Sequence, residues 1–151
     1  VETYERFVDL FRSASTPQEQ LRYLYALAAF DNEDLVRRTC EFALSGDVRT
    51  QNAPFVIARA IANRRHGATA WRFIREHWAE ANERFPANTI GRMVDPVKLL
   101  NRDADGADVQ AFFAEHDIPQ ASRLLAQVLE RQRVNIALRA NQEGPLRSSL
   151  A

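Results

Sequence analysis

The chain has 151 residues, of which 46% are hydrophobic, so it is long enough to form one domain with a sizeable core. Its 20 basic and 20 acidic residues give a formal net charge of zero, and Lys98 is the only lysine. This balance provides no field that would steer the chain to nucleic acid or to an anionic membrane. No apolar run approaches the length of a membrane span. We therefore expect neither a nucleic acid nor a membrane as a partner.

Cys40 is the only cysteine, which excludes an intrachain disulfide and a metal cluster built from cysteines of this chain. A single cysteine fits a reducing compartment, and we expect a cytoplasmic location. The chain begins at Val1 inside an amphipathic pattern, without the charged, apolar and small regions of a signal peptide. This start leads us to expect a fragment of a longer polypeptide.

Apolar residues recur at intervals of three and four along most of the chain, which predicts helices and no strands. Thr16, Pro17 and Glu19 predict a helix start with a capping box. Ser45 and Gly46 predict a helix end. The expected helices fall within residues 1–13, 16–30, 35–44, 54–61, 68–85, 90–100, 109–113 and 119–136.

The most regular apolar stripe lies within residues 68–85, between Gly67 and Pro86. It contains both tryptophans of the chain. The stripe consists of Trp71, Ile74, Trp78, Ala81 and Phe85. Burial of each large side chain contributes roughly 1.5–3 kcal/mol, so this helix is predicted to face other helices in the core. Proline disfavours the α conformation in the residue before it, which predicts a helix end at Phe85.

Eight short helices with brief connections predict successive antiparallel pairs that stack as a right-handed α-solenoid. No strict period of about 30 to 50 residues is visible, so the repeats would be degenerate. An ordinary helical bundle is the alternative architecture. We expect one helical-repeat domain over residues 1–140 and a frayed tail over residues 141–151, where Gly144 and Pro145 interrupt the pattern.

Few residues indicate a catalytic or metal-binding role. His66, His77 and His116 are far apart in sequence, and none belongs to an H-E-x-x-H pair. The chain has no glycine-rich phosphate loop and no G-x-S-x-G elbow. Cys40 lies among apolar helix positions without a base beside it, which predicts a buried, inert thiol. The residues alone therefore predict a helical domain without catalytic or metal-ligating residues.

Three stretches in order carry a resemblance to a known family. They are LSGDVRTQNAP, HGATAWRFIREHW, and DVQAFF followed by LLAQVLERQRVNIAL. The sequence from about Thr16 to Leu138 resembles the C-terminal helical region of the zinc aminopeptidases related to puromycin-sensitive aminopeptidase and bacterial aminopeptidase N. The resemblance implies a curved superhelix of HEAT- or armadillo-like hairpins. Such a domain would pack on the catalytic domain, enclose the peptide chamber and gate or select peptide substrates.

The same resemblance implies that this region has no cofactor of its own. In the family, zinc is held by an H-E-x-x-H helix and a more distant glutamate of the catalytic domain, and a glycine-Met-Glu-Asn-type loop binds the amino terminus of the substrate. Neither motif occurs here. The metal and the catalytic residues would therefore lie upstream of Val1, and this chain alone would cleave nothing.

Within D-V-R-T-Q-N, the resemblance singles out Arg49 and Gln51 as candidates to face the chamber and contact a peptide. Arginine can bind a carboxylate through two parallel hydrogen bonds. The alternative is structural: Arg49 would cap helix carbonyls and Gln51 would cap the following helix. Asn52 stands where relatives often carry an acidic residue, which could alter a local cap or ion pair.

Two other classes of function stay open at this point. One is a free-standing helical-repeat module that binds protein partners along its concave face. The other is a helical DNA-binding regulator, against which the neutral charge and the dispersed arginines count.

Overall fold

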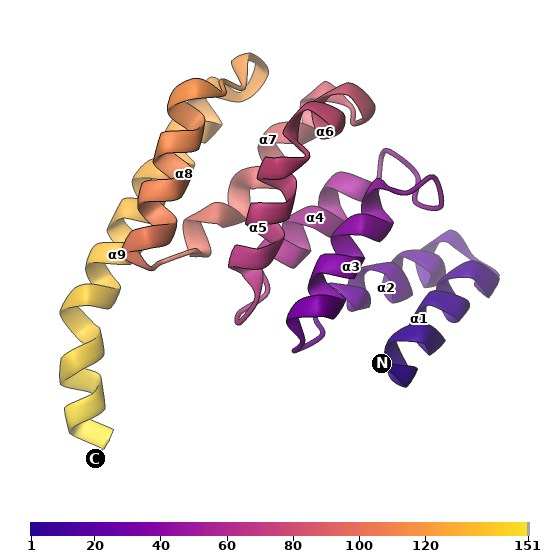
Figure 1. Ribbon diagram of the computed structural model, residues 1–151, viewed down its shortest axis with the longest axis horizontal. Coiled ribbons are helices and arrows are strands. Elements are labelled where there is room, and N and C mark those ends of the chain that lie inside the picture. Colours follow the sequence, from indigo (N-terminus) through magenta and orange to yellow (C-terminus); the bar gives the residue numbers. More distant parts are fainter. Residues whose placement is uncertain (151) are drawn as a thin grey trace.

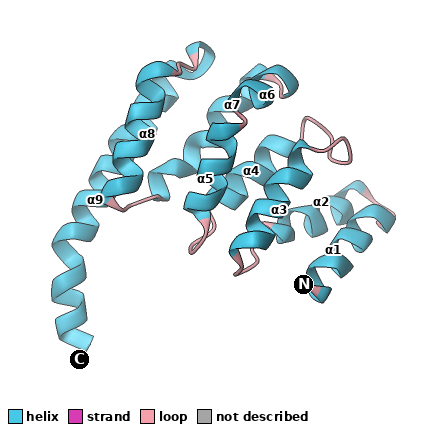
Figure 2. Cartoon of the chain, viewed as in Figure 1, coloured by secondary structure: helices cyan, strands magenta, loops and turns pink. Residues whose placement is uncertain are grey.

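The computed structural model describes residues 1–150, and this part of the chain contains helices and loops but no strand (Figures 1 and 2). The predicted all-α class is therefore confirmed. The α-helices are α1 (Glu2–Ser13), α2 (Pro17–Leu27), α3 (Glu33–Leu44), α4 (Ala53–Ile61), α5 (Gly67–Glu76), α6 (Trp78–Arg84), α7 (Ala87–Val94), α8 (Asp103–Glu115) and α9 (Ser122–Leu150). Two 3₁₀ helices join them, η1 (Asp95–Leu99) and η2 (Pro119–Ala121).

The helices form two layers of antiparallel neighbours, as Figure 1 shows. The front layer contains the first helix of each hairpin, namely α1, α3, α5 and α8. The rear layer contains the returning helices α2, α4, α7 and α9. Along the chain α1 packs on α2, α3 on α4, and α8 on α9, while α4 also packs on α7. This side-by-side order of hairpins is the arrangement that the sequence predicts, and it differs from a closed bundle.

A period that is invisible in the sequence is clear in space. The rear-layer helices begin at Pro17, Ala53, Ala87 and Ser122, which are 34 to 36 residues apart. Four side-chain amides also donate to backbone carbonyls of the preceding hairpin, 32 to 37 residues earlier. These hydrogen bonds are Asn63 to Ala28 (2.9 Å), Gln120 to Ala87 (3.0 Å), Gln132 to Leu100 (3.0 Å) and Asn135 to Lys98 (2.7 Å). These bonds join the second hairpin to the first and the fourth to the third, at a spacing of about one repeat.

The helix α2 begins with the predicted side-chain cap, and α3 begins with a similar one. The Oγ1 atom of Thr16 accepts a hydrogen bond from the Glu19 amide at 3.2 Å, and Oδ1 of Asn32 accepts from the Leu35 amide at 3.0 Å. The Glu19 carboxylate reaches back to the amide of Ser15 (3.3 Å) rather than to that of Thr16. These bonds satisfy amides that the first turn of each helix leaves without an intrahelical partner.

The stripe within residues 68–85 is buried as predicted, with Trp71 3% exposed and Ile74 fully buried, except that Trp78 is half-buried. The prediction of one continuous helix is wrong, because the chain breaks at His77 between α5 and α6. The Nδ1 atom of His77 lies 2.8 Å from the Phe73 carbonyl oxygen, and the two rings stack at 4.1 Å. The side chain thus binds a carbonyl at the end of α5, where the backbone leaves the helical conformation.

Toward the C-terminus, other helix boundaries differ from the predicted ones. The helix α8 begins six residues before the predicted start, at Asp103, and the stretch predicted as one helix within residues 90–100 ends in the 3₁₀ helix η1. The last helix continues through Gly144 and Pro145 to Leu150, over the stretch predicted to fray. Ion pairs from Glu143 to Arg139 (3.1 Å) and Arg147 (2.8 Å) span this part of α9. Fraying of this end in solution stays a prediction.

Candidate functional site

Arg49 and Gln51 lie in the connection between α3 and α4, and both side chains are exposed. The backbone carbonyl of Arg49 accepts hydrogen bonds from the amides of Asn52 (2.8 Å) and Ala53 (3.0 Å), which start α4. Within residues 1–150, neither side chain makes a hydrogen bond or an ion pair. The capping roles are thus not seen, and the role of both residues in peptide contact stays a prediction.

The histidines do not fit a zinc site. His66 Nε2 lies 3.1 Å from Asp31 Oδ1, and His116 repeats the arrangement of His77 by approaching the Phe112 carbonyl at 2.9 Å. In the described part of the chain, no three potential metal ligands gather. Cys40 is fully buried, and burial raises the pKa of its thiol to about 12, so the thiol stays protonated at neutral pH.

The two layers carry opposite charge. The front-layer helices contain 11 acidic and 6 basic residues, a balance of −5. The rear-layer helices contain 3 acidic and 8 basic residues, a balance of +5. The helix α8 is the extreme case, with four acidic residues and no basic one. A chain without net charge therefore presents one acidic and one basic layer.

Two arginines of the front layer pair with carboxylates of neighbouring hairpins. Arg38 binds Glu5 of the preceding front-layer helix, and Arg75 binds Asp108 of the following one. Asp108 also accepts a hydrogen bond of 2.8 Å from Nε1 of Trp71. These pairs join successive repeats, so the front-layer charges have a structural role.

Arginines of the rear layer lack such partners. At least one exposed arginine on each rear-layer helix makes no ion pair with any described residue. These arginines are Arg22 on α2, Arg59 on α4, Arg92 on α7 and Arg123 on α9. These four arginines were not identified from the sequence, although Arg59 is the only charged residue of its helix. A lone arginine in an otherwise apolar helix was the available signal.

One of these arginines lies over a groove between α2 and α4. The α2–α4 groove has a volume of about 440 Å³ and is lined by residues that include Tyr25, Ala28, Arg59 and Asn63. The guanidinium carbon of Arg59 lies 4.3 Å from the centre of the Tyr25 ring. This cation–π contact orients the guanidinium while its N–H groups stay able to bind an anion.

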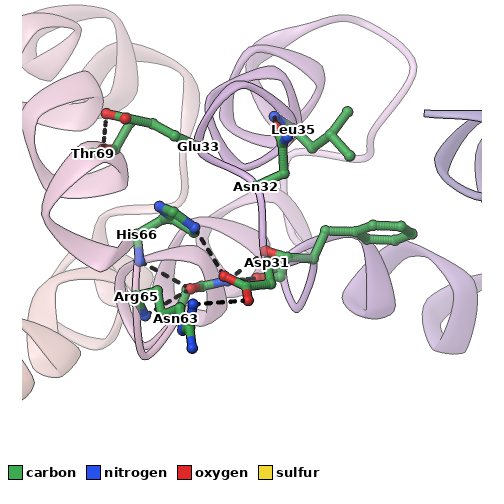
Figure 3. A network of polar contacts seen from close by, with 10 residues as sticks. Asp31, Asn32, Glu33, Leu35, Asn63, Arg65, His66 and Thr69 are labelled. Atoms are coloured by element: carbon green, nitrogen blue, oxygen red, sulfur yellow. Dashed lines mark hydrogen bonds and ion pairs between the residues drawn. The ribbon is translucent and has the colours of Figure 1, made fainter.

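Hydrogen bonds between the α2–α3 and α4–α5 loops, drawn in Figure 3, involve residues that line one end of the α2–α4 groove. Besides its bond to Ala28, Asn63 Nδ2 donates to the Phe30 carbonyl at 3.0 Å. Its Oδ1 atom accepts from the amides of Arg65 (3.1 Å) and His66 (3.0 Å). Asn63 therefore holds the α4–α5 loop against the end of α2. Arg65, which also lines the groove, lies 3.4 Å from Asp31 across the same junction.

A longer groove runs between α7 and α9. It consists of two hollows of about 450 and 470 Å³ that share Leu124 and Gln127. Arg92 and Arg123 line the first hollow, and Arg131 lines the second. Lys98 also lines the second hollow, but it is paired with Asp95 at 2.6 Å. This α7–α9 groove thus combines arginines at both ends with an apolar side chain between them.

The profile of the ERAP1-like C-terminal domain matches residues 1–134. The chain belongs to this family. Its relatives are aminopeptidases, so the resemblance seen in the sequence is confirmed, and the chain corresponds to a C-terminal domain of M1 aminopeptidases. The part of α9 after residue 134 lies outside the match.

Individual relatives agree with this assignment. The aminopeptidase C-terminal domain is 30% identical over 133 residues to Aminopeptidase M1-A of Oryza sativa subsp. japonica, covering 87% of this chain and 15% of that protein. It is 26% identical over 128 residues to Leucyl aminopeptidase of Saccharolobus solfataricus, covering 83% and 16%. It is 27% identical over 133 residues to Glutamyl aminopeptidase of Rattus norvegicus, covering 85% and 14%. The chain thus spans about 15% of the length of the first of these relatives.

None of the helices within residues 1–150 combines the length and the hydrophobicity needed to cross a bilayer.

Proposed function

We propose that this domain is the non-catalytic wall of the peptide chamber in a zinc-dependent aminopeptidase. It would pack on the catalytic domain and gate or select peptides by their fit to the wall. Family membership and the aminopeptidase names of its relatives support the proposal. The described histidines do not fit zinc, so the metal would be held by residues outside this chain.

The rear layer is the face that we assign to the peptide. The single observation that carries this assignment is its set of exposed arginines without carboxylate partners within residues 1–150, of which Arg59, Arg92 and Arg123 line grooves. In the front layer, by contrast, Arg38 and Arg75 are paired with carboxylates of neighbouring hairpins. Peptides carry carboxylates, and arginine binds a carboxylate with two parallel hydrogen bonds.

The spacing of the helices supports the same face. In the rear layer α4 packs directly on α7, and α9 packs on η1. In the front layer α3 likewise packs directly on α5, but α5 and α8 are kept apart by rings, with Trp71 lying 5.3 Å from Phe112 and 5.5 Å from Phe113 between centroids. Closer helices lie on the inner side of a bend, so we assign the concave side to the rear layer. Solenoids use such concave surfaces for binding.

The test uses the full-length protein that contains this domain. We expect Arg59→Ala to lower the turnover of long peptides about three-fold, the size of one exposed ion pair, and to leave a single-residue chromogenic substrate unaffected. Arg72→Ala is the matched control, because Arg72 lies on the front-layer helix α5 and is an exposed arginine without an ion pair within residues 1–150. An equal loss on both substrates, or an equal loss in the control, would contradict the proposal.

Arg49→Ala and Gln51→Ala belong in the same series. A selective loss on long peptides would extend the peptide-contacting surface to the α3–α4 connection. No change, or an equal change on both substrates, would remove these two residues from the proposed contact.

A free-standing protein-interaction module is the second candidate. It is favoured by a groove of about 750 Å³ beside the end of α9, lined by Leu99, Leu138, Leu146 and Leu150 among others. These four leucines are between 52% and 86% exposed. The coding sequence upstream of Val1 distinguishes the two candidates. An H-E-x-x-H pair there supports the aminopeptidase wall, and a nearby start codon supports the module.

A further inference from the structure

We infer that the rear layer selects peptides with acidic side chains, because its grooves present arginines that form no ion pair with a carboxylate within residues 1–150. The inference rests on the proposed function, since it assumes that the rear layer faces the peptide. It adds the class of substrate that this face prefers.

The α2–α4 groove provides one carboxylate-binding position. Arg59 is exposed, and its guanidinium is stacked over Tyr25 rather than paired with an acid. Stacking restricts the side chain before any ligand arrives, which lowers the entropy lost on binding. Arg64 lines the same groove and also has no ion-pair partner within residues 1–150, so two arginines without such a partner line one groove.

The α7–α9 groove provides a longer, mixed surface. Arg92 and Arg123 come from neighbouring helices and line the same hollow, so a single acidic side chain there would meet positive charge from both helices. Leu124 and Val128 line the adjoining hollow, and Arg131 lies at that end as well. An extended peptide with acidic residues on either side of an apolar residue fits this order of side chains.

The same details favour a peptide over a nucleic acid. A nucleic acid presents a phosphate at every nucleotide, and its affinity rises with the number of phosphates that are neutralised. Asp95 and Glu130 line the α7–α9 groove, and Asp31 lines the α2–α4 groove. A continuous row of phosphates would meet these carboxylates, whereas the acidic residues of a peptide can be spaced to avoid them.

The experiment measures binding of fluorescent peptides to the 151-residue chain by anisotropy. Two peptides of equal length differ only in glutamate against glutamine at alternate positions, so that shape is kept and charge is changed. We expect the glutamate peptide to bind about ten-fold more tightly at low salt, the sum of a few exposed ion pairs. The preference should fall as salt is raised, because exposed pairs are screened.

Variants locate the effect. Arg92→Gln combined with Arg123→Gln should weaken binding of the glutamate peptide about ten-fold, and Arg59→Gln about three-fold, with the glutamine peptide unaffected. Arg72→Gln on the front layer should change neither. Circular dichroism melts of each variant confirm that a loss of binding is not a loss of folding.

The other outcomes overturn the inference in distinguishable ways. Equal binding of both peptides removes the preference for acidic residues and leaves the proposed peptide wall intact. A loss in Arg72→Gln as large as in the rear-layer variants removes the rear layer as the site. A single-stranded oligonucleotide that displaces the glutamate peptide at a lower concentration than unlabelled peptide assigns the surface to nucleic acid. If neither peptide binds the chain and Arg59→Ala leaves the turnover of long peptides unchanged, both proposals fail.

Discussion

The front and rear layers use the same kinds of charged residue for different purposes. In the front layer, Arg38 and Arg75 bind carboxylates of neighbouring hairpins and so hold the stack together. In the rear layer, Arg59 and Arg92 remain exposed beside grooves without a carboxylate partner in the described chain. An overall charge of zero can therefore arise from two faces of opposite sign. Composition does not reveal such a pattern, because a ligand that approaches one face meets only the charge of that face.

The largest expected effect concerns the rings that separate α5 and α8. Trp71 is 3% exposed and contacts Phe112 and Phe113 of α8. Trp71→Ala should lower the free energy of unfolding by about 3–5 kcal/mol, because it opens a cavity between two front-layer helices. Urea denaturation measures the loss, with Arg72→Ala as the neighbouring exposed control. A loss below that expected of a surface residue would show that the front layer is not held by this cluster.

A smaller loss of stability is expected where Asn63 joins the α4–α5 loop to the end of α2. Asn63 donates to Ala28 and Phe30 and accepts from Arg65 and His66. Asn63→Ala should cost about 2 kcal/mol, because several backbone groups lose their partner at once. Asn82→Ala removes an exposed asparagine with one local bond and serves as control. Equal effects of the two substitutions on the urea midpoint would contradict a special role for Asn63.

The close packing of the rear layer predicts a third effect. A Cβ added at Gly91 would lie 2.7 Å from the Cβ of Ala121, so α7 and η2 would have to separate. Gly91→Ala should therefore destabilise the domain by about 1–3 kcal/mol. A Cβ at Gly46 has no atom within 4 Å, and Gly46→Ala should change stability by less than about 0.5 kcal/mol. If the two variants have the same melting temperature, the contact between α7 and η2 at Gly91 is not closely packed.

The smallest effect is a pH dependence of one front-layer pair. The hydrogen bond from Arg38 lowers the pKa of the Glu5 carboxyl below its ordinary value of 4.5 in the folded state. The stabilisation is thus complete above pH 4.5 and is lost as the pH falls through the lowered pKa. Glu5→Gln should be less stable than the wild type at neutral pH and equal to it in strong acid. Denaturant midpoints across this range measure the gap, and a gap that does not change with pH would contradict the assignment.

Much of the fold could be predicted because the signals are local. The spacing of Trp71, Ile74 and Ala81 identified a buried helix face, and Thr16 marked a helix start that its side chain does cap. The break at His77 could not be predicted, since it depends on a histidine ring that stacks on Phe73 and binds its carbonyl. The candidate site was harder still. Motif resemblance directed attention to the α3–α4 connection, while the grooves with Arg59, Arg92 and Arg123 lie between helices that are distant in sequence.

Helix formation, helix capping and family resemblance were readable from the chain alone, because each depends on residues that are close in sequence. The repeat of about 35 residues and the opposite charges of the two layers required the folded arrangement. The reason is physical: the amide side chains that join hairpins donate to backbone carbonyls, which every residue type carries, so the accepting positions show no repeated residue. Likewise, charges from separate helices act together only when folding places those helices on one surface.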